Sequence, residues 1–146
     1  MKVDIYVKIL LRKNFAEGGN GAALIEYVPS GKKPVTRIVT ESFFLGTNNR
    51  IELEMCNKAL KKLIKPCVVT IHTSNRYIKS AMINDWPKRW RDKGWKKATG
   101  KPPANIQEWK QLLMLCEIHK VSWEEYDTKY DKELTEALEK ERKSYG

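Results

Sequence analysis

Apolar residues occupy every second position at residues 3–7, where they alternate with charged or polar neighbours. This period-two pattern is typical of a strand with one buried face. A glycine-rich turn at residues 17–21 leads to a second expected strand over residues 22–28. Residues 29–32, Pro-Ser-Gly-Lys, have the composition of a turn. We therefore predict a hairpin formed by the second strand and a third strand that ends near Phe44.

From Arg50 the apolar spacing changes to that of a helix. Either Asn48 or Asn49 is available as its N-cap. One face of this predicted helix is formed by Ile51, Met55, Ala59, Leu60, Leu63 and Ile64.

The second half of the chain alternates between strand and helix patterns. Residues 67–72 predict a buried strand, and a short helix over about residues 76–85 should stop before Pro87. Another helix face follows at Ile106, Trp109, Leu112, Leu113 and Cys116. Residues 121–126 predict the last strand. The charged tail over residues 129–143 predicts a helix whose inner face is Leu134, Ala137 and Leu138.

The predicted order is three strands, a helix, a strand, helices, a strand and a final helix. This order indicates one α/β domain with a mixed sheet, built from hairpins on one side and right-handed crossovers on the other. A chain of 146 residues is long enough to bury a core of its own, so we take residues 1–146 as a single domain and expect a monomer.

The composition adds a bias in charge. Lys and Arg exceed Asp and Glu by 28 to 18, a net charge of +10, which favours a polyanionic partner, although an evenly spread basic surface would have the same total. Cys56, Cys67 and Cys116 lack metal-ligand spacing, and we interpret them as reduced thiols of a cytoplasmic protein. We predict no membrane span and no signal peptide.

Five segments resemble ribonuclease HI, in order and at the family's spacing, across residues 3–126. The specific ones are Thr47-Asn48-Asn49-Arg50-Ile51-Glu52-Leu53, similar to the family's T-N-N-R-x-E-L signature, and the tryptophan-rich run from Trp86 to Trp109. The others are residues 3–22, 73–78 and 121–124. The resemblance implies a five-stranded sheet, three antiparallel strands followed by parallel ones, flanked by helices and carrying a basic protrusion.

The resemblance also implies a chemistry, the metal-assisted hydrolysis of RNA in RNA–DNA hybrids. In this family four acidic residues hold two Mg²⁺ ions about 4 Å apart around the scissile phosphate. Here the first acidic position falls on Lys8, the second is kept as Glu52, and the third falls on Ser74. The fourth could be Asp131 or Asp127, and the loop that carries the family's catalytic His is missing.

Lys8 places a cation where a divalent metal would bind. At about 4 Å and an effective dielectric of about 20, each charge pair contributes on the order of 4 kcal/mol, so both the lost carboxylate and the gained ammonium oppose Mg²⁺. We predict a Lys8–Glu52 ion pair that replaces the metal bridge. The alternatives are an alignment slip that makes Asp4 the true ligand, and a Glu52 that only favours the helix start.

A basic handle, residues 86–101, holds seven Lys or Arg against one Asp and is similar to the family's basic protrusion, which grips the DNA strand of a hybrid. Cations neutralise phosphates and aromatic rings offer flat surfaces to sugars and bases. The alternative is that the tryptophans only pack the handle on the sheet. Its candidate nucleic-acid contacts are Trp86, Lys88, Arg89, Trp90, Arg91, Lys93, Trp95, Lys96 and Lys97.

Amide side chains at positions that match the family's hybrid contacts complete the interface: Asn14, Asn48, Asn49, Asn75 and Asn105. Amides suit hydrogen bonds to phosphates and 2′-hydroxyls, although Asn49 could instead be only a helix cap.

We therefore predict a protein that binds RNA–DNA hybrids or other duplexes and has lost metal-dependent cleavage, with no cofactor. One alternative is an active or weakly active ribonuclease that uses Mg²⁺ or Mn²⁺ at Glu52 and Asp131. Another is an adaptor that binds a protein partner in a larger nucleic-acid machine.

Overall fold

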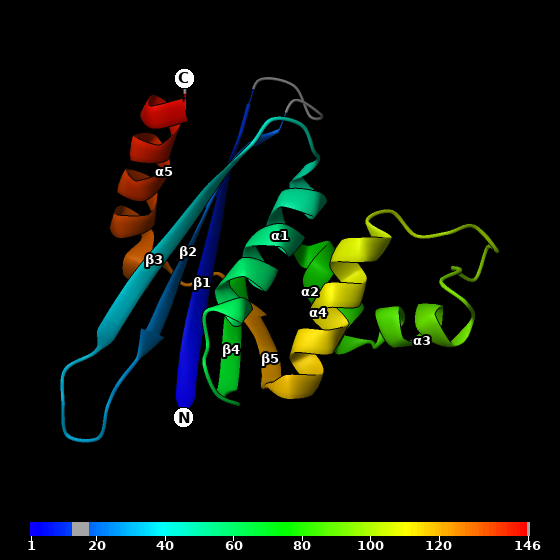
Figure 1. Cartoon of the computed structure of the whole chain (residues 1–146), viewed down its shortest axis with the longest axis horizontal. Helices are drawn as coiled ribbons and strands as arrows, with labels where there is room; N and C mark the ends of the chain where they lie inside the picture. The colour runs from blue at the N-terminus through cyan, green and yellow to red at the C-terminus, as the bar shows by residue number, and fades with distance from the viewer. Residues whose placement is uncertain (13–17, 146) are drawn as a thin grey trace.

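A computed structural model describes residues 1–12 and 18–145. Its elements follow the predicted order (Figure 1): β1 (Lys2–Leu11), β2 (Gly19–Tyr27), β3 (Val35–Phe43), α1 (Asn48–Lys61), β4 (Val68–Thr73), α2 (Arg76–Ile83), α3 (Trp86–Asp92), α4 (Ile106–Ile118), β5 (Lys120–Glu125), η1 (Thr128–Tyr130) and α5 (Asp131–Tyr145).

The strands form one mixed sheet in the order β3-β2-β1-β4-β5. β1 pairs antiparallel with β2, and β2 with β3, whereas β4 runs parallel to both β1 and β5. This confirms the predicted five-stranded sheet with hairpins at one end and crossovers at the other. β1 is the central strand, so a residue at its end can reach elements from both halves of the chain.

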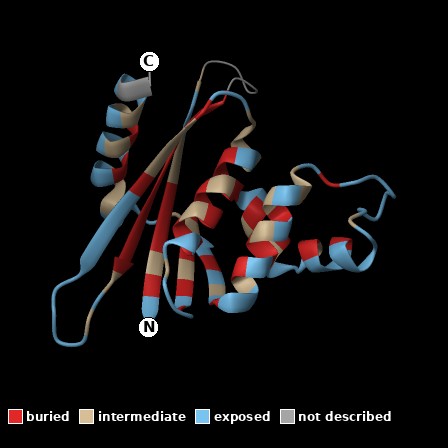
Figure 2. Cartoon of the chain, viewed as in Figure 1, coloured by how far each residue is buried: buried red, intermediate tan, exposed pale blue. Residues whose placement is uncertain are grey.

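The alternation along β1 divides the two faces of the sheet between two hydrophobic clusters. Ile5 and Val7 belong to the main core beneath α1, whereas Tyr6 packs with Leu134 and Leu138 of α5 on the opposite face. Figure 2 shows buried residues along β1, β2 and α1 and mostly exposed residues in the loop that follows α3. The packing of Leu134, Ala137 and Leu138 in the cluster with Tyr6 confirms the predicted inner face of α5.

The glycine-rich stretch differs from the expected turn, because β2 begins at Gly19 and runs through it. A Cβ added at Gly21 would lie 2.4 Å from Cγ of Met55 in α1, so glycine allows the helix to approach the strand closely.

Helix α1 is shorter at its C-terminal end than the apolar pattern predicted. It ends at Lys61, and the side chain of Ile64 is 98% exposed, so the prediction that Ile64 belongs to the inner face is wrong. Pro66 lies two residues further on, where the chain turns toward β4. A proline disfavours helical geometry at the residue before it.

Candidate active site and nucleic-acid interface

Lys8 lies near the end of β1 on the sheet face that α5 covers. Its Nζ is 2.6 Å from Oδ1 of Asp131, the first residue of α5, and donates to Oγ1 of Thr135 at 3.0 Å. The hydroxyl of Tyr126 donates to the same Asp131 oxygen at 2.6 Å. Both donors lower the pKa of the Asp131 carboxyl, the Lys8 hydrogen bond most strongly. This ion pair is half-exposed, with 32% of the Lys8 and 39% of the Asp131 side chain accessible.

The contacts of Asp131 decide which carboxylate of the C-terminal segment accompanies Lys8. Asp127 instead accepts a hydrogen bond from the backbone N–H of Lys129 at 2.9 Å and caps η1. Thr135, which the sequence reasoning missed, lies one helical turn after Asp131. That i, i+4 spacing is the signal that would have placed it on the same helix face.

Glu52 is buried beneath the sheet on the side of α1. Its Oε1 accepts a hydrogen bond from the hydroxyl of Thr73 at 3.0 Å, and its Oε2 has no partner among the residues that the structure describes. Burial raises the pKa of the Glu52 carboxyl to about 7, against the opposing effect of the Thr73 hydrogen bond. The Thr73 donor was not anticipated, although its position just before Ser74 in the family-like segment is a usable signal.

The predicted Lys8–Glu52 ion pair is wrong, because Lys8 pairs with Asp131. The two side chains line the same pocket but have different partners. Lys8 is held at α5 by Asp131 and Thr135, whereas Glu52 is buried in α1 and accepts from the Thr73 hydroxyl. Asp131 also stays partly in water, so its ionised form bears a smaller desolvation cost than a buried Glu52 would.

The alternative in which Asp4 replaces Lys8 at the site finds no support in the contacts of Asp4. Its Oδ1 lies 2.9 Å from Nε2 of His72, and the His72 ring stacks on Tyr6 with ring centroids 4.5 Å apart. Asp4 is four residues before Lys8 along β1, about 13 Å of extended strand.

Ser74 and Asn75 follow β4 directly. Ser74 is exposed, whereas Asn75 is buried and caps α2 by accepting from the backbone N–H of Ile78 at 2.9 Å. The Asn75 amide also donates to Oδ1 of Asn49 at 2.8 Å. Neither Asn48 nor Asn49 caps α1, because the cap is Thr47, whose hydroxyl accepts from the N–H of Arg50. Asn49 and Asn75 therefore hold the starts of α1 and α2 together.

One pocket of about 280 Å³ brings these elements together. Its lining includes Lys8, Asn48, Glu52, Ser74 and Tyr126, together with Val7 and Ile9. Three of the four positions that the family resemblance singles out thus meet at one place, and the fourth, Asp131, is bonded to two of the lining side chains.

The side chains around this pocket do not fit a divalent metal. They offer an ammonium, a hydroxyl, a buried carboxyl with a raised pKa, and a carboxylate already paired with the ammonium. Mg²⁺ requires several hard oxygen ligands in octahedral geometry. Within residues 1–12 and 18–145, no group of three or more His, Cys, Asp and Glu side chains is arranged to hold a metal ion.

The basic handle contains a short helix, α3, that the sequence reasoning did not predict. Pro87 stands in the first turn of α3, where its ring is compatible with helix, and the preceding helix already ends at Ile83 rather than at residue 85. Trp90 is buried and packs edge-on against Trp109, with ring centroids 5.5 Å apart. Trp86 and Trp95 are half-buried against the same core. Their placement favours the packing interpretation for Trp90 and leaves the other two side chains partly exposed.

The handle cations divide into two groups. Those on α3 have partners: Lys88 with Asp85, Arg89 with the carbonyl of Asn84, and Arg91 with Glu117. Those in the loop after it are exposed: Lys93, Lys96, Lys97 and Lys101. Asn105 is half-buried at the start of α4 with φ 62° and forms no side-chain cap. Asn14 lies outside the described residues.

The sequence matches a family model described as RNase H over residues 5–126. The ribonuclease H of Acetivibrio thermocellus is 31% identical over 97% of this chain and 98% of that protein. The ribonuclease H of Psychromonas ingrahamii is 36% identical over 84% of this chain and 75% of that protein.

Solved structures share the fold. LC9-RNase H1, a type 1 RNase H with the type 2 active-site motif, superposes with a TM-score of 0.71 and 28% identity, covering 86% of this chain and 62% of that one. A foamy viral protease-reverse transcriptase in complex with an RNA/DNA hybrid has a TM-score of 0.67 at 13% identity, covering 94% of this chain and 18% of that one. In the part of the chain that the structure describes, the helices are too short or too polar to cross a membrane.

Proposed function

Because the chain belongs to the ribonuclease H family, we propose that it binds RNA–DNA hybrids or related A-like duplexes without metal-dependent cleavage. The observation that carries this proposal is the Lys8–Asp131 ion pair. In it, a lysine stands on β1 at the position where the resemblance places the family's first metal-binding acid.

The ion pair opposes metal-dependent hydrolysis in two ways. A metal would have to displace Lys8 from Asp131, and it would then lie close to an ammonium group. Each unit charge pair at about 4 Å is worth on the order of 4 kcal/mol at an effective dielectric of about 20. Ser74 supplies a hydroxyl in place of a carboxylate, and the Glu52 carboxyl, with its pKa of about 7, is only partly ionised at neutral pH.

The exposed cations of the handle loop support duplex binding. The segment after α3 extends away from the sheet (Figure 1), and its Lys93, Lys96 and Lys97 are exposed, unlike the cations of α3, which have partners. Unpaired surface cations bind phosphates and release counterions.

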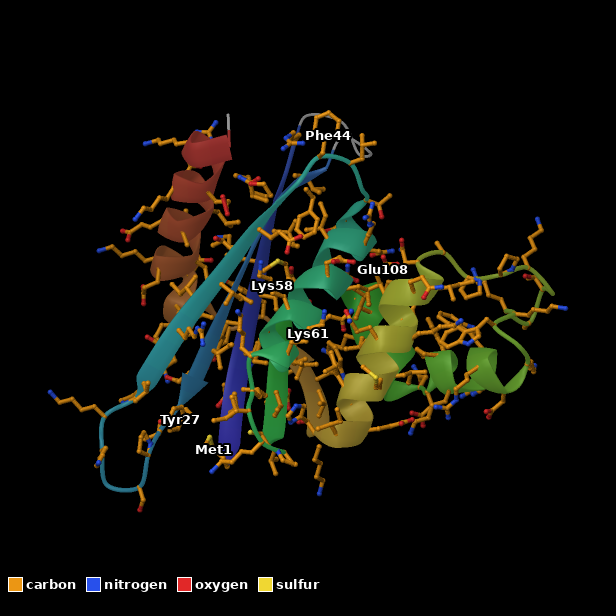
Figure 3. The ribbon with its side chains drawn as sticks, in the orientation of Figure 1. Met1, Tyr27, Phe44, Lys58, Lys61 and Glu108 are labelled. Carbon is orange, nitrogen blue, oxygen red and sulfur yellow. The ribbon has the colours of Figure 1, made fainter. Side chains whose placement is uncertain are left out.

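A salt titration of binding to a fluorescent RNA–DNA hybrid tests this proposal. Neutralising Lys96 and Lys97 together, each to Gln, should weaken binding and lower the slope of log K against log salt by about 2, since each phosphate contact contributes about 0.9. The control is the pair Lys61→Gln and Lys62→Gln, at the C-terminal end of α1 (Figure 3 labels Lys61), which removes the same charge away from the handle. Absence of binding at low salt would refute duplex binding and leave the adaptor role.

An active ribonuclease is the second candidate, favoured by relatives that carry that name at 31% and 36% identity. Incubating a labelled hybrid with Mg²⁺ or Mn²⁺ decides between the two. Cleavage that Glu52→Gln abolishes would assign catalysis to this chain and overturn the proposal. No cleavage, with binding intact, is the result we expect.

A further inference from the structure

The pocket at the end of β1 presents a cation at the place where the family's reaction requires a backbone phosphate. We propose that Lys8 contacts a phosphate of the bound duplex directly, so that this contact takes the place of a metal bridge. The inference rests on the proposed duplex binding and goes further by naming the residue, the group it binds and the independence from divalent ions.

The hydrogen bonds of Lys8 leave room for such a contact. A lysine ammonium has three N–H donors. Asp131 and Thr135 accept two of them, at 2.6 and 3.0 Å. Lys8 also lines the pocket, and about a third of its side chain is accessible. The third donor is therefore available to an acceptor that enters from solvent.

Two neutral donors lie in the same lining. The hydroxyl of Ser74 and the amide of Asn48 have no hydrogen-bond partner within the described part of the chain. A phosphate diester has two free oxygens and can accept from several donors at once. The Ser74 hydroxyl, which removes a metal ligand, is thus a suitable second donor to the same phosphate.

The charge of the pocket also favours an anion. Compared with the family's four carboxylates, this chain lacks two negative charges and gains one positive charge. Of the two remaining carboxyls, Asp131 is neutralised by its pairing with Lys8, and Glu52 is only 2% exposed and bonded to Thr73. A phosphate that approaches Lys8 therefore meets little of the repulsion that a four-carboxylate site exerts without its metals.

Lys8 could instead serve only to anchor α5 through Asp131, and the two roles predict different measurements. An anchoring role affects stability, whereas a phosphate contact also affects the salt dependence of duplex binding. Each phosphate contact contributes about 0.9 to the slope of log K against log salt. The slope is thus the readout that an anchoring lysine would not change.

The experiment measures binding of a short fluorescent RNA–DNA hybrid to the wild type, Lys8→Met, Lys8→Arg and the charge-matched control Lys61→Met. Each titration is run in EDTA and in Mg²⁺ at equal ionic strength. We expect wild-type affinity to be the same in both. We expect Lys8→Met to weaken binding about tenfold at low salt and to lower the salt slope by about 1. Lys8→Arg should keep most of the affinity, and Lys61→Met should lose less than Lys8→Met.

Several results would overturn the inference. Wild-type binding that requires Mg²⁺ would show that a metal, not Lys8, holds the phosphate. Hybrid binding by Lys8→Met equal to that of the wild type, with the same slope, would assign Lys8 to anchoring alone while leaving the proposed function intact. A wild type that does not bind the hybrid at low salt would refute the proposed function itself. The comparison of EDTA with Mg²⁺ uses only the wild type, so its result is valid even if Lys8→Met folds poorly.

Discussion

Glu52 makes the stability of the fold depend on pH in a direction that the structure determines. Its pKa is about 7 in the folded protein against an ordinary value of 4.5, because burial disfavours the ionised form more than the Thr73 hydrogen bond favours it. Between these two values the folded state binds more protons than the unfolded state, so stability falls as pH rises. Below 4.5 the carboxyl is protonated in both states, and above 7 it is ionised in both.

The size of this effect follows from the two pKa values. One pKa unit corresponds to about 1.4 kcal/mol, so a rise from 4.5 to about 7 destabilises the folded state at alkaline pH by about 3.5 kcal/mol relative to acid pH. Glu52→Gln removes the titration and keeps an oxygen that can accept from Thr73. The stability difference between the wild type and this variant should therefore shift by about 2.5 kcal/mol between about pH 5 and about pH 8, in favour of the variant.

Urea unfolding of both proteins across this pH range measures the shift, and subtracting one curve from the other removes the contributions of all other titrating groups. The matched control is Glu124→Gln, which makes the same substitution at an exposed position of β5. A stability difference between the wild type and Glu52→Gln that stays constant with pH would show that Glu52 is solvated. A shift of opposite sign would show that Glu52 is paired with a cation, as a Lys8–Glu52 bridge requires.

Three further predictions follow from the packing and from the site. The double variant Lys8→Asp with Ser74→Asp should bind Mg²⁺ and cleave the RNA of a hybrid, measured on a labelled substrate; a folded variant without cleavage would show that the site geometry differs from that of an active member. Gly21→Ala should destabilise the protein by about 1–3 kcal/mol in urea unfolding, because its Cβ would lie 2.4 Å from Cγ of Met55. The buried thiol of Cys56, whose pKa burial raises well above its ordinary value, should react with a thiol reagent only on unfolding, and rapid labelling of the native protein would contradict its position in the core.

The elements that were predicted correctly carry their signal locally. The alternation at residues 3–7 places Ile5 and Tyr6 on opposite faces of β1, and the spacing of Leu134 and Leu138 identifies the face of α5 that meets the sheet. These patterns depend on neighbours within two or four residues, so one segment is enough to show them.

The features that were missed have two causes: competing local signals, and a partner distant in the sequence. Thr47 caps α1 although two asparagines follow it, because only its hydroxyl reaches the N–H of Arg50. Helix α3 begins at a Trp-Pro pair inside a run of cations, where charge obscures the apolar spacing of Trp86 and Trp90. The partner of Lys8 could not be read from the sequence, because both remaining acids of the site were available to it.

The two surviving acids of the site have opposite environments, and this difference explains why Lys8 neutralises only one of them. Asp131 is half in water, ionised, and bonded to Lys8 and Tyr126. Glu52 is buried and bonded to the Thr73 hydroxyl, and protonation, rather than a cation, avoids the cost of a buried charge there. Lys8, at the family's first acidic position, therefore holds the start of α5 through Asp131 without a metal. Glu52 stays protonated below its raised pKa, and a divalent ion would have to deprotonate it. The resulting pocket combines a cation, neutral donors and little exposed negative charge, which is the chemistry of a phosphate-binding site.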